Sequence, residues 1–425
     1  MSTLSVADRE KVERKNFVLN MYEGGLFISS GGIVSVQTVL PALVARLGGS
    51  DVAVGALSVL VFAGVFLPQI FAARLVETLP WKKPWSVRFG FLQRLSLLVN
   101  GIAIWILGKD CPSLALGIFF LLITSQQVFG GIATPGWFDF FAKLTPTQKR
   151  GRLIGIRVSL GGLGALLSGG LLTWMLGHVA FPASYALAMM VASMIQFSSL
   201  AVQSRLVELE PSVTVSRRPV SAYFRELPGM LQKNPEFKRF IISAAFLIPA
   251  TMPVGFFTVY VLRRFETGEA IVGTLTVSMV AIQVVSALIT GYVADHFGNK
   301  VALVASGAAM LCASVTAVLA PGPGWFILVF MFVGINAGSE IMSRYNIAVE
   351  FSPPEQRSTY VGLMNTVLAP CYGLALLGGI VSQMFGYEAL FLAGIACSLI
   401  GLYLLIFTVK DPRQRALLSR PQPAA

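Results

Sequence analysis

The chain has 425 residues, of which 55% are hydrophobic and 12% are charged, and its formal net charge is +12. Its mean hydropathy is +0.74, whereas a soluble domain carries about 25% charged residues. This composition excludes a soluble globular protein and places most of the chain in a lipid bilayer. The two histidines and four cysteines show no metal-ligand spacing, so we expect no metal site.

Apolar runs of membrane-spanning length follow one another along the whole chain. A hydrocarbon core of about 30 Å requires about 20 apolar residues per helix. We predict an all-α membrane protein with two pseudo-repeated six-helix halves, 1–205 and 240–425, joined by a cytoplasmic linker, 206–239. The twelve predicted transmembrane helices lie at about 18–45, 52–73, 87–107, 113–141, 153–176, 183–204, 240–262, 271–293, 301–319, 325–349, 360–383 and 388–408.

The basic residues are distributed unevenly between alternate loops. With twelve spans and a cytoplasmic N-terminus, 26 Lys/Arg lie in cytoplasmic segments and four on the opposite side. This bias indicates that both termini are cytoplasmic in a plasma (inner) membrane. The net charge therefore reflects orientation, and we expect no nucleic-acid partner. The first fifteen residues are charged and are no cleavable signal, so the first span is the expected insertion signal.

The linker contains two kinds of sequence. Residues 207–218 are polar, and we expect them to be flexible. After Pro219, apolar residues recur at helical spacing up to Leu231, which predicts a short helix. That helix lies either on the cytoplasmic lipid surface or on the cytoplasmic loops of the protein itself.

Glycine and proline are concentrated inside three predicted spans. Glycines at helical spacing let helices approach closely, and prolines bend them. The contacts serve either packing alone or the sliding of helices in a protein that changes conformation. The residues concerned are Gly24, Gly25, Gly31 and Gly32 in the first span, Gly161, Gly162, Gly164, Gly169 and Gly170 in the fifth, and Pro249 and Pro253 in the seventh.

Two polar turns read almost alike. Thr145-Pro-Thr-Gln-Lys-Arg150-Gly and Ser352-Pro-Pro-Glu-Gln-Arg357-Ser each separate two apolar runs, and their arginines are 207 residues apart. A repeat of half the chain length indicates two homologous membrane halves.

A third polar loop follows the eighth span. Gly291-Tyr-Val-Ala-Asp295-His-Phe-Gly298-Asn-Lys300 resembles the cytoplasmic-loop signature of the major facilitator superfamily, G-x-x-x-D-x-x-G-x-K/R. A small residue permits tight packing, the carboxylate caps a helix, glycine turns the chain, and the cation neutralises the carboxylate. In the first half, Ala73, Glu77, Pro80 and Lys82 stand at the corresponding positions.

The resemblance extends to the span count and to four loops. It implies loops that latch one conformation, and the expected latch residues are Asp139, Arg150, Gly291, Asp295, Gly298, Lys300 and Arg357. The fourth span lacks the intramembrane arginine of the proton-driven exporters, and Ala165 stands where their signature has Gly-Pro. The sequence also lacks the motifs of the sugar porters.

The resemblance implies that spans 1, 4, 7 and 10 line a central cavity. In span 10, Asn336, Glu340 and Arg344 are spaced by four residues and share a helix face. Glu340 lies about 15 Å from the helix end at Glu350, near mid-membrane. It either binds a proton or a cationic part of the substrate, or forms a structural pair with Arg344.

Spans 1 and 4 offer further polar side chains. Glu23, Ser30 and Gln37 are spaced by seven residues, and Gln126 and Gln127 lie in span 4. We select Glu23, Gln37 and Gln127, together with Asn336, Glu340 and Arg344, as candidates for contact with a substrate or coupling ion.

Three residues near these candidates have alternative roles. Asp139 could pair with Arg74, Lys82 or Arg88 as a latch, which we favour over substrate contact. Arg94 in span 3 needs a carboxylate partner, and Glu23 and Asp139 are the available ones. Trp137 either stacks on a substrate ring or anchors the helix at the membrane interface.

These features predict a secondary transporter that moves a small molecule by alternating access, with protons as a candidate coupling ion. The sequence has no P-loop and no catalytic constellation, so we expect no enzyme activity, no cofactor and no direct use of ATP. The alternatives are a transporter-like receptor or scaffold, which the membrane-embedded charge disfavours, and a channel, which the paired halves disfavour. We expect a monomer in the lipid bilayer.

Overall fold

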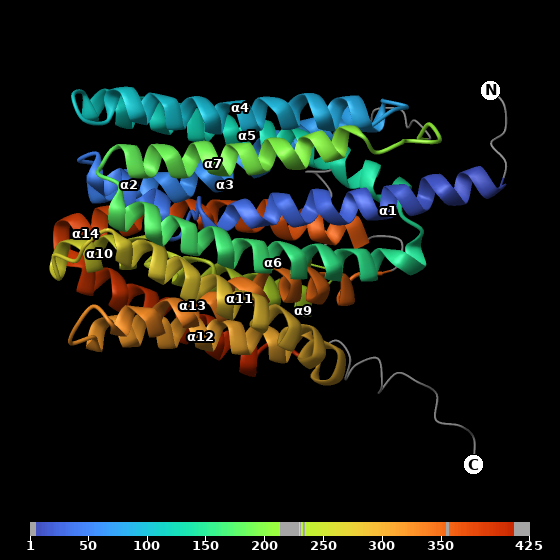
Figure 1. Cartoon of the computed structure of the whole chain (residues 1–425). Helices are drawn as coiled ribbons and strands as arrows, with labels where there is room; N and C mark the ends of the chain where they lie inside the picture. Colours follow the sequence, from blue (N-terminus) through green and yellow to red (C-terminus); the bar gives the residue numbers. More distant parts are fainter. Residues whose placement is uncertain (1–5, 213–228, 230, 233, 354–356, 412–425) are drawn as a thin grey trace, which may run out of the picture. The chain divides into compact units, whose positions relative to one another are not determined.

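The computed structural model describes residues 6–212, 229, 231–232, 234–353 and 357–411, which form helices joined by turns with no strand among them (Figure 1). The first eight elements are α1 (Val6–Ser29), the 3-10 turn η1 (Ser30–Gly32), α2 (Val39–Arg46), α3 (Asp51–Glu77), α4 (Lys83–Leu107), α5 (Pro112–Leu144), α6 (Thr147–His178) and α7 (Ala183–Ser204). The later elements are α9 (Pro235–Leu247), the 3-10 turn η2 (Pro249–Thr251), α10 (Val254–Arg264), α11 (Ala270–Phe297), α12 (Asn299–Leu319), α13 (Trp325–Glu350) and α14 (Arg357–Phe407). The predicted all-α fold is confirmed.

Ten helical segments in the described part of the chain are long and apolar enough to cross a membrane. The last, Tyr360–Phe407, covers the predicted runs 360–383 and 388–408, and Gly386, with a φ of 86°, interrupts its helical path. The first predicted run, 18–45, is divided among α1, η1 and α2. The count of twelve spans therefore stays a prediction.

Large apolar side chains cover the outward faces of these helices. Leu167 is 78% exposed, Phe407 73% and Leu319 70%. A soluble monomer rarely exposes so much contiguous apolar surface, whereas a bilayer solvates it. The surface of the helices thus agrees with the membrane location that the composition predicts.

The chain forms two compact units. Unit 1 contains Met1–Ala53, Leu57–Arg217 and Gly268–Val277, and unit 2 contains Val54–Ala56, Arg218–Thr267 and Ser278–Ala425. Apart from the two short segments 54–56 and 268–277, the units follow the order of the chain. The exact boundaries of the predicted halves, at 205 and 240, stay a prediction.

Within unit 1, α1 packs along α6 and α7, and α4 packs between α5 and α7 (Figure 1). The α1–α6 contact is close because glycines lie on both helices. A Cβ at Gly32 would overlap the carbonyl oxygen of Ala165, and a Cβ at Gly164 would overlap Ser29. The Ser168 hydroxyl donates to the Ser29 carbonyl at 2.6 Å. The predicted role in close helix packing is confirmed for Gly32 and Gly164, whereas a Cβ at Gly31 or Gly170 would meet no atom within 4 Å.

Two predicted spans are interrupted helices. In the first, Ser29 and Ser30 donate their hydroxyls to the carbonyls of Gly25 and Phe27, at 2.6 and 2.7 Å, next to the break at η1. In the seventh, Pro249 begins η2, and Pro253 directly precedes α10. Proline lacks an N–H and ends the regular hydrogen-bond ladder. Both breaks lie where the glycines and prolines are concentrated.

The seventh span begins earlier than the sequence predicts. Helix α9 starts at Pro235, within the predicted linker 206–239. The side chain of Asn234 accepts a hydrogen bond from the Phe237 backbone at 3.1 Å, and such an N-cap fixes the start of a helix. The predicted helix after Pro219 lies outside the described residues, apart from Gly229, Leu231 and Gln232.

The α1–α6 contact allows a test with adjacent residues. We expect Gly32→Ala to lower the midpoint of thermal unfolding, since forcing atoms into a packed contact costs about 1–3 kcal/mol. Gly31→Ala is the control because no heavy atom lies within 4 Å of a Cβ at that position. The measurement is thermal unfolding of both variants in the same detergent. Equal midpoints for the two variants would contradict the tight contact at Gly32.

Candidate functional site

A buried ion pair lies in unit 2, on α13. Arg344 Nε is 2.8 Å from Glu340 Oε1, and the side chains are 3% and 19% exposed, respectively. The Arg344 guanidinium also donates to the Tyr372 hydroxyl of α14 at 2.7 Å. Its carbon lies 5.8 Å from the centre of the Tyr372 ring. The predicted proximity of Glu340 and Arg344 is therefore observed, and sequence reasoning missed Tyr372.

Asn336 does not join this cluster. Its amide donates to the hydroxyl and the carbonyl of Ser306 on α12, at 2.9 and 3.3 Å. The spacing of four residues placed it on the same helix face as Glu340, but its side chain is held by the neighbouring helix. The predicted stripe thus divides into a charged pair and a helix–helix contact.

A second buried ion pair lies in unit 1. Arg157 Nη1 of α6 is 2.8 Å from Glu23 Oε2 of α1, and the side chains are 9% and 4% exposed. Asn20 also accepts from the Arg157 guanidinium. Sequence reasoning missed Arg157, because it was counted among the cytoplasmic cations of 143–157, although it lies within the predicted fifth span, 153–176. The length of α6, which begins at Thr147, brings Arg157 to α1.

Aromatic rings cover the Arg157 guanidinium. Its carbon lies 5.0 Å from the centre of the Trp137 ring and 5.3 Å from that of Phe141. A cation over an aromatic face gains up to about 2 kcal/mol when it is desolvated. Trp137 therefore packs on an internal cation, a role that neither predicted alternative included.

Arg94 is held by backbone carbonyls. Its guanidinium donates to Gln196 O at 2.7 Å and to Gly90 O at 2.8 Å, and its carbon lies 5.4 Å from the centre of the Phe27 ring. Among the described residues, neither Glu23 nor Asp139 lies within ion-pair distance of it. Helix carbonyls thus provide the hydrogen-bond acceptors of Arg94, and Glu23, one of its two expected partners, interacts with it electrostatically beyond ion-pair distance.

The remaining candidates in spans 1 and 4 lie at the break of the first span. Gln37 accepts a hydrogen bond from Ser35 Oγ at 3.2 Å in the segment between η1 and α2. Since the helix is interrupted there, Gln37 does not share a continuous helix face with Glu23. Gln127 of α5 lines a cavity beside this break.

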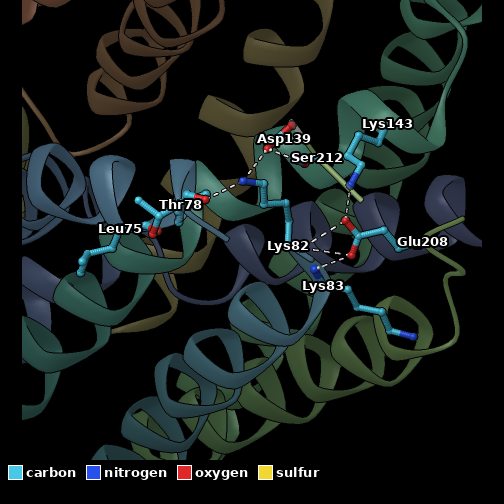
Figure 2. Close-up of polar contacts among 9 residues, drawn as sticks. Leu75, Thr78, Lys82, Lys83, Asp139, Lys143, Glu208 and Ser212 are labelled. Carbon is cyan, nitrogen blue, oxygen red and sulfur yellow. Dashed lines mark hydrogen bonds and ion pairs between the residues drawn. The ribbon is translucent and has the colours of Figure 1, made fainter. Parts of the chain in front are cut away.

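A cluster of polar residues, four of them charged, lies where the predicted linker begins (Figure 2). This linker-end cluster comprises Lys82, Asp139, Lys143, Glu208 and Ser212. Lys82 Nζ is 3.2 Å from Asp139 Oδ2, so Lys82 is the partner of Asp139 among the three predicted. The Lys82 side chain is 1% exposed and that of Asp139 is 41% exposed, so a buried cation meets a carboxylate open to its surroundings, an arrangement compatible with the predicted latch role of Asp139.

Glu208 connects the linker to α4 and α5 (Figure 2). Its carboxylate accepts from the backbone N–H groups of Lys82 and Lys83 at 3.0–3.1 Å and from Lys143 Nζ at 2.6 Å. A carboxylate at a helix N-terminus satisfies the free N–H groups of the first turn. The start of the predicted linker thus makes specific contacts at Glu208, the expected flexibility of 207–218 stays a prediction, and 213–218 lie outside the described residues.

Two other predicted latch residues, Arg150 and Lys300, lie in the first turns of α6 and α12. Arg150 donates to the carbonyls of Ala142 and Thr145, at 2.7 and 3.3 Å, and so closes the end of α5. Lys300 donates to the carbonyls of Ile406 and Val409, at 3.0 and 2.7 Å, where α14 ends. A cation at a helix C-terminus stabilises the last carbonyls.

The glycines of the signature loop differ in their environment. Gly298, between α11 and α12, has a φ of 93°, which a side chain would strain, so the predicted turn is confirmed. No described atom lies within 4 Å of a Cβ at Gly291, so the expected tight packing of Gly291 is not observed. Asp295 ends the same helix, and the side chain of Arg357 lies outside the described part of the chain.

Helices of membrane-spanning length, with charges paired inside them, define a multi-pass membrane protein. Residues 24–370, and again 239–425, match the sequence model of the Major Facilitator Superfamily. The chain therefore belongs to this superfamily and is a secondary transporter.

Similar proteins agree with this assignment. The solved structure of a variant of the nucleoside transporter NupG has a TM-score of 0.70 at 13% identity, covering 94% of this chain and 100% of that one. A bacterial homologue of the human lysosomal transporter Spinster has a TM-score of 0.65 at 15% identity, covering 99% and 100%. The probable transporter AQR1 of Saccharomyces cerevisiae is 23% identical over 158 residues, 36% of this chain and 26% of that protein. The match thus spans about a quarter of the yeast relative.

The linker-end cluster yields a prediction. We expect Glu208→Ala to lower the midpoint of thermal unfolding and to speed hydrogen exchange in 207–212, since each buried donor left unpaired costs about 1–3 kcal/mol. Glu210→Ala is the control because Glu210 pairs with Arg9 and is 67% exposed, where ion pairs contribute little. Equal exchange and equal midpoints in the two variants would contradict the capping role of Glu208.

Proposed function

We propose that the protein carries a small molecule across the plasma membrane by alternating access, with Glu340 as the group that couples transport to protons. We further propose that it works as a monomer, with both termini and the linker in the cytoplasm, without an enzymatic step, a cofactor or a nucleic-acid partner. The observation that carries the proposal is the buried cluster of Glu340, Arg344 and Tyr372.

The cluster has the properties that a coupling site needs. An ionised group at mid-membrane costs on the order of 2.5–3.5 kcal/mol on insertion scales unless it is paired. Glu340 and Arg344 together are neutral, whereas protonation of Glu340 leaves the site with one positive charge. Arg344 then keeps the Tyr372 hydroxyl as an acceptor. Protonation of Glu340 therefore changes the net charge of the site but leaves the hydrogen bond from Arg344 to the Tyr372 hydroxyl in place.

The exposure of the two side chains supports this division of roles. Glu340 is 19% exposed and Arg344 is 3% exposed. A proton can reach a partly exposed carboxylate, while the enclosed arginine provides a fixed positive charge. A purely structural scaffold has no use for so costly a pair in its membrane core, which disfavours the scaffold and receptor alternatives.

The interrupted helices support alternating access. The first span of each predicted half is broken by a short 3-10 turn, η1 in one and η2 in the other. Interrupted helices at corresponding positions of two repeats mark the substrate region in many transporters. We propose that the loops with Asp139, Arg150, Asp295, Lys300 and Arg357 stabilise one of the alternating conformations.

Proton coupling predicts a specific defect for Glu340→Gln. In proteoliposomes, with a substrate identified by a binding screen, this variant should lose accumulation driven by a pH gradient. It should retain exchange down a substrate gradient, because the amide keeps the size of the side chain but cannot release a proton. Glu23→Gln is the matched control, since Glu23 is also a buried glutamate paired with an arginine.

The structural alternative predicts a different pattern. If the pair only holds α13 in place, Glu340→Gln leaves Arg344 buried and unpaired, and the loss of one partner costs about 3–5 kcal/mol. The double variant Glu340→Gln/Arg344→Gln would then recover stability and activity together. This recovery, or full pH-driven accumulation by the folded single variant, would contradict the coupling role.

The proposed orientation can be tested independently. A cysteine introduced by Ser216→Cys, in an otherwise cysteine-free background, should react with a membrane-impermeant thiol reagent only after the membrane is permeabilised. The segments on the same side as the linker carry 26 basic residues, whereas those on the opposite side carry four. Such an excess of basic residues marks the cytoplasmic side. Labelling in intact cells would contradict a cytoplasmic linker.

A further inference from the structure

The Arg344 side chain makes two different kinds of contact in unit 2. Its Nε atom lies 2.8 Å from Glu340 Oε1, but this nitrogen makes no hydrogen bond, so the pair rests on charge. The one hydrogen bond from the guanidinium to a described residue goes to the Tyr372 hydroxyl, at 2.7 Å. Tyr372 therefore fixes the direction of the guanidinium, whereas Glu340 balances its charge.

Two tyrosine rings flank the same guanidinium. Its carbon lies 6.0 Å from the centre of the Tyr345 ring and 5.8 Å from that of the Tyr372 ring, at about the limit within which a ring attracts a cation. The two hydroxyls differ, because that of Tyr372 accepts from Arg344 and that of Tyr345 accepts from Asn365 Nδ2 at 3.2 Å. Among the described contacts, Tyr372 is thus the tyrosine that acts on the cation through its hydroxyl.

The ion pair itself does not depend on Tyr372. Glu340 and Arg344 are four residues apart on α13, and side chains at this spacing are neighbours on any α-helix. Tyr372 belongs to α14. Without the Tyr372 hydroxyl, an ionised Glu340 would still neutralise Arg344.

Protonation of Glu340 changes what Arg344 depends on. With an ionised Glu340, the guanidinium has a counter-charge one helical turn away. With a protonated Glu340, the charge of the guanidinium meets neutral groups, and the Tyr372 oxygen is the one that accepts its hydrogen bond. Hydrogen bonds to charged groups are stronger than those between neutral groups. The Tyr372 hydroxyl is therefore worth more to the protonated form of the site than to the ionised form.

We propose that Tyr372 is a positioning residue that raises the proton affinity of Glu340 by acting on Arg344. This inference rests on the coupling function proposed above and adds the residue that regulates the carboxylate. A contact that stabilises the protonated form more than the ionised form raises the pH at which half of the groups are protonated. Because Tyr372 is on α14 and the ion pair is on α13, protonation of Glu340 is linked to the contact between these two helices.

The titratable neighbours of Glu340 belong to this arrangement. Glu340 interacts electrostatically with Arg344 and Tyr372, and Arg344 interacts with Tyr345. The described side-chain contacts of α11 and α12 with this stretch of α13 come from hydroxyls that carry no charge, namely Ser286 and Thr290 toward Ser339, and Ser306 toward Asn336.

The test is an infrared titration of the reconstituted full-length protein, in which a protonated Glu340 gives a carbonyl band that Glu340→Gln lacks. In Tyr372→Phe, the midpoint of this band should move to lower pH by about one unit, a tenfold lower proton affinity. The reason is that a hydrogen bond to a charged group is lost mainly from the protonated form.

Tyr345→Phe is the matched control. Both tyrosine rings pack against the same apolar cluster of unit 2, which contains Leu363 and Met364. Each phenylalanine therefore keeps the ring and its packing and removes one hydroxyl. The band in Tyr345→Phe should titrate with the midpoint of the unmodified protein.

Thermal unfolding measures the same link in a second way. Glu340→Gln imitates the uncharged form of the carboxyl group. At a pH above the midpoint of the infrared titration, Tyr372→Phe should lower the unfolding temperature more in the Glu340→Gln background than in the unmodified one, since both residues act on one cation. Tyr345→Phe should lower it equally in the two backgrounds, as a contact that serves packing alone would.

Several results would overturn the role of Tyr372. They are an unchanged or higher midpoint in Tyr372→Phe, an equal shift in Tyr345→Phe, and equal losses of stability in the two backgrounds. If no carbonyl band of Glu340 titrates in the unmodified protein, the coupling function fails and the inference fails with it. If the shift is present but proteoliposomes show no flux, the transport function fails and the role of Tyr372 stands.

Discussion

A charge in the middle of a membrane must find its counter-charge within the protein, and this constraint organises both units. In unit 1 the pair joins two helices, since Glu23 is on α1 and Arg157 on α6. In unit 2 both charges lie on α13, and Tyr372 on α14 completes the coordination of Arg344. Breaking such a pair costs several kcal/mol, so each pair restricts which helix arrangements are possible.

The surroundings of the two pairs differ in a way that bears on function. Glu23 and Arg157 are enclosed by Asn20 and by the rings of Trp137 and Phe141. This closed, ring-covered pair is suited to holding α1 against α6, next to the glycine contacts of the same helices. Glu340 is more exposed than Arg344, so the pair in unit 2 combines a fixed cation with an accessible carboxylate. The second arrangement is the one that can respond to protonation.

The sequence predicted those features that depend on residue type and periodicity. The helical membrane fold followed from hydropathy, close helix packing at glycines from their spacing, and the turn at Gly298 from a motif, whereas the pairing of α1 with α6 was not predicted. The neighbourhood of Glu340 and Arg344 followed from their spacing of four residues on one helix. Each of these inferences uses only residues that are close in the chain, or a pattern repeated along it.

Contacts between distant segments could not be predicted in the same way. Arg157 was counted as a cytoplasmic cation because a basic residue near a span end is usually a topology signal, yet α6 begins ten residues before it. Glu208 was part of a polar segment with no pattern that indicates a helix cap 126 residues away. Trp137 was given two external roles, while its ring covers an internal cation. In all three, the partner is determined by how helices pack, which a single sequence does not reveal.

The central claim is that Glu340 exchanges a proton within the membrane, and infrared difference spectroscopy tests it without a known substrate. Titration of the reconstituted protein should produce a carbonyl band of a protonated carboxyl group that is absent in Glu340→Gln and retained in Glu23→Gln. If the band is unchanged in Glu340→Gln, or no such band titrates in the unmodified protein, Glu340 is not the coupling group.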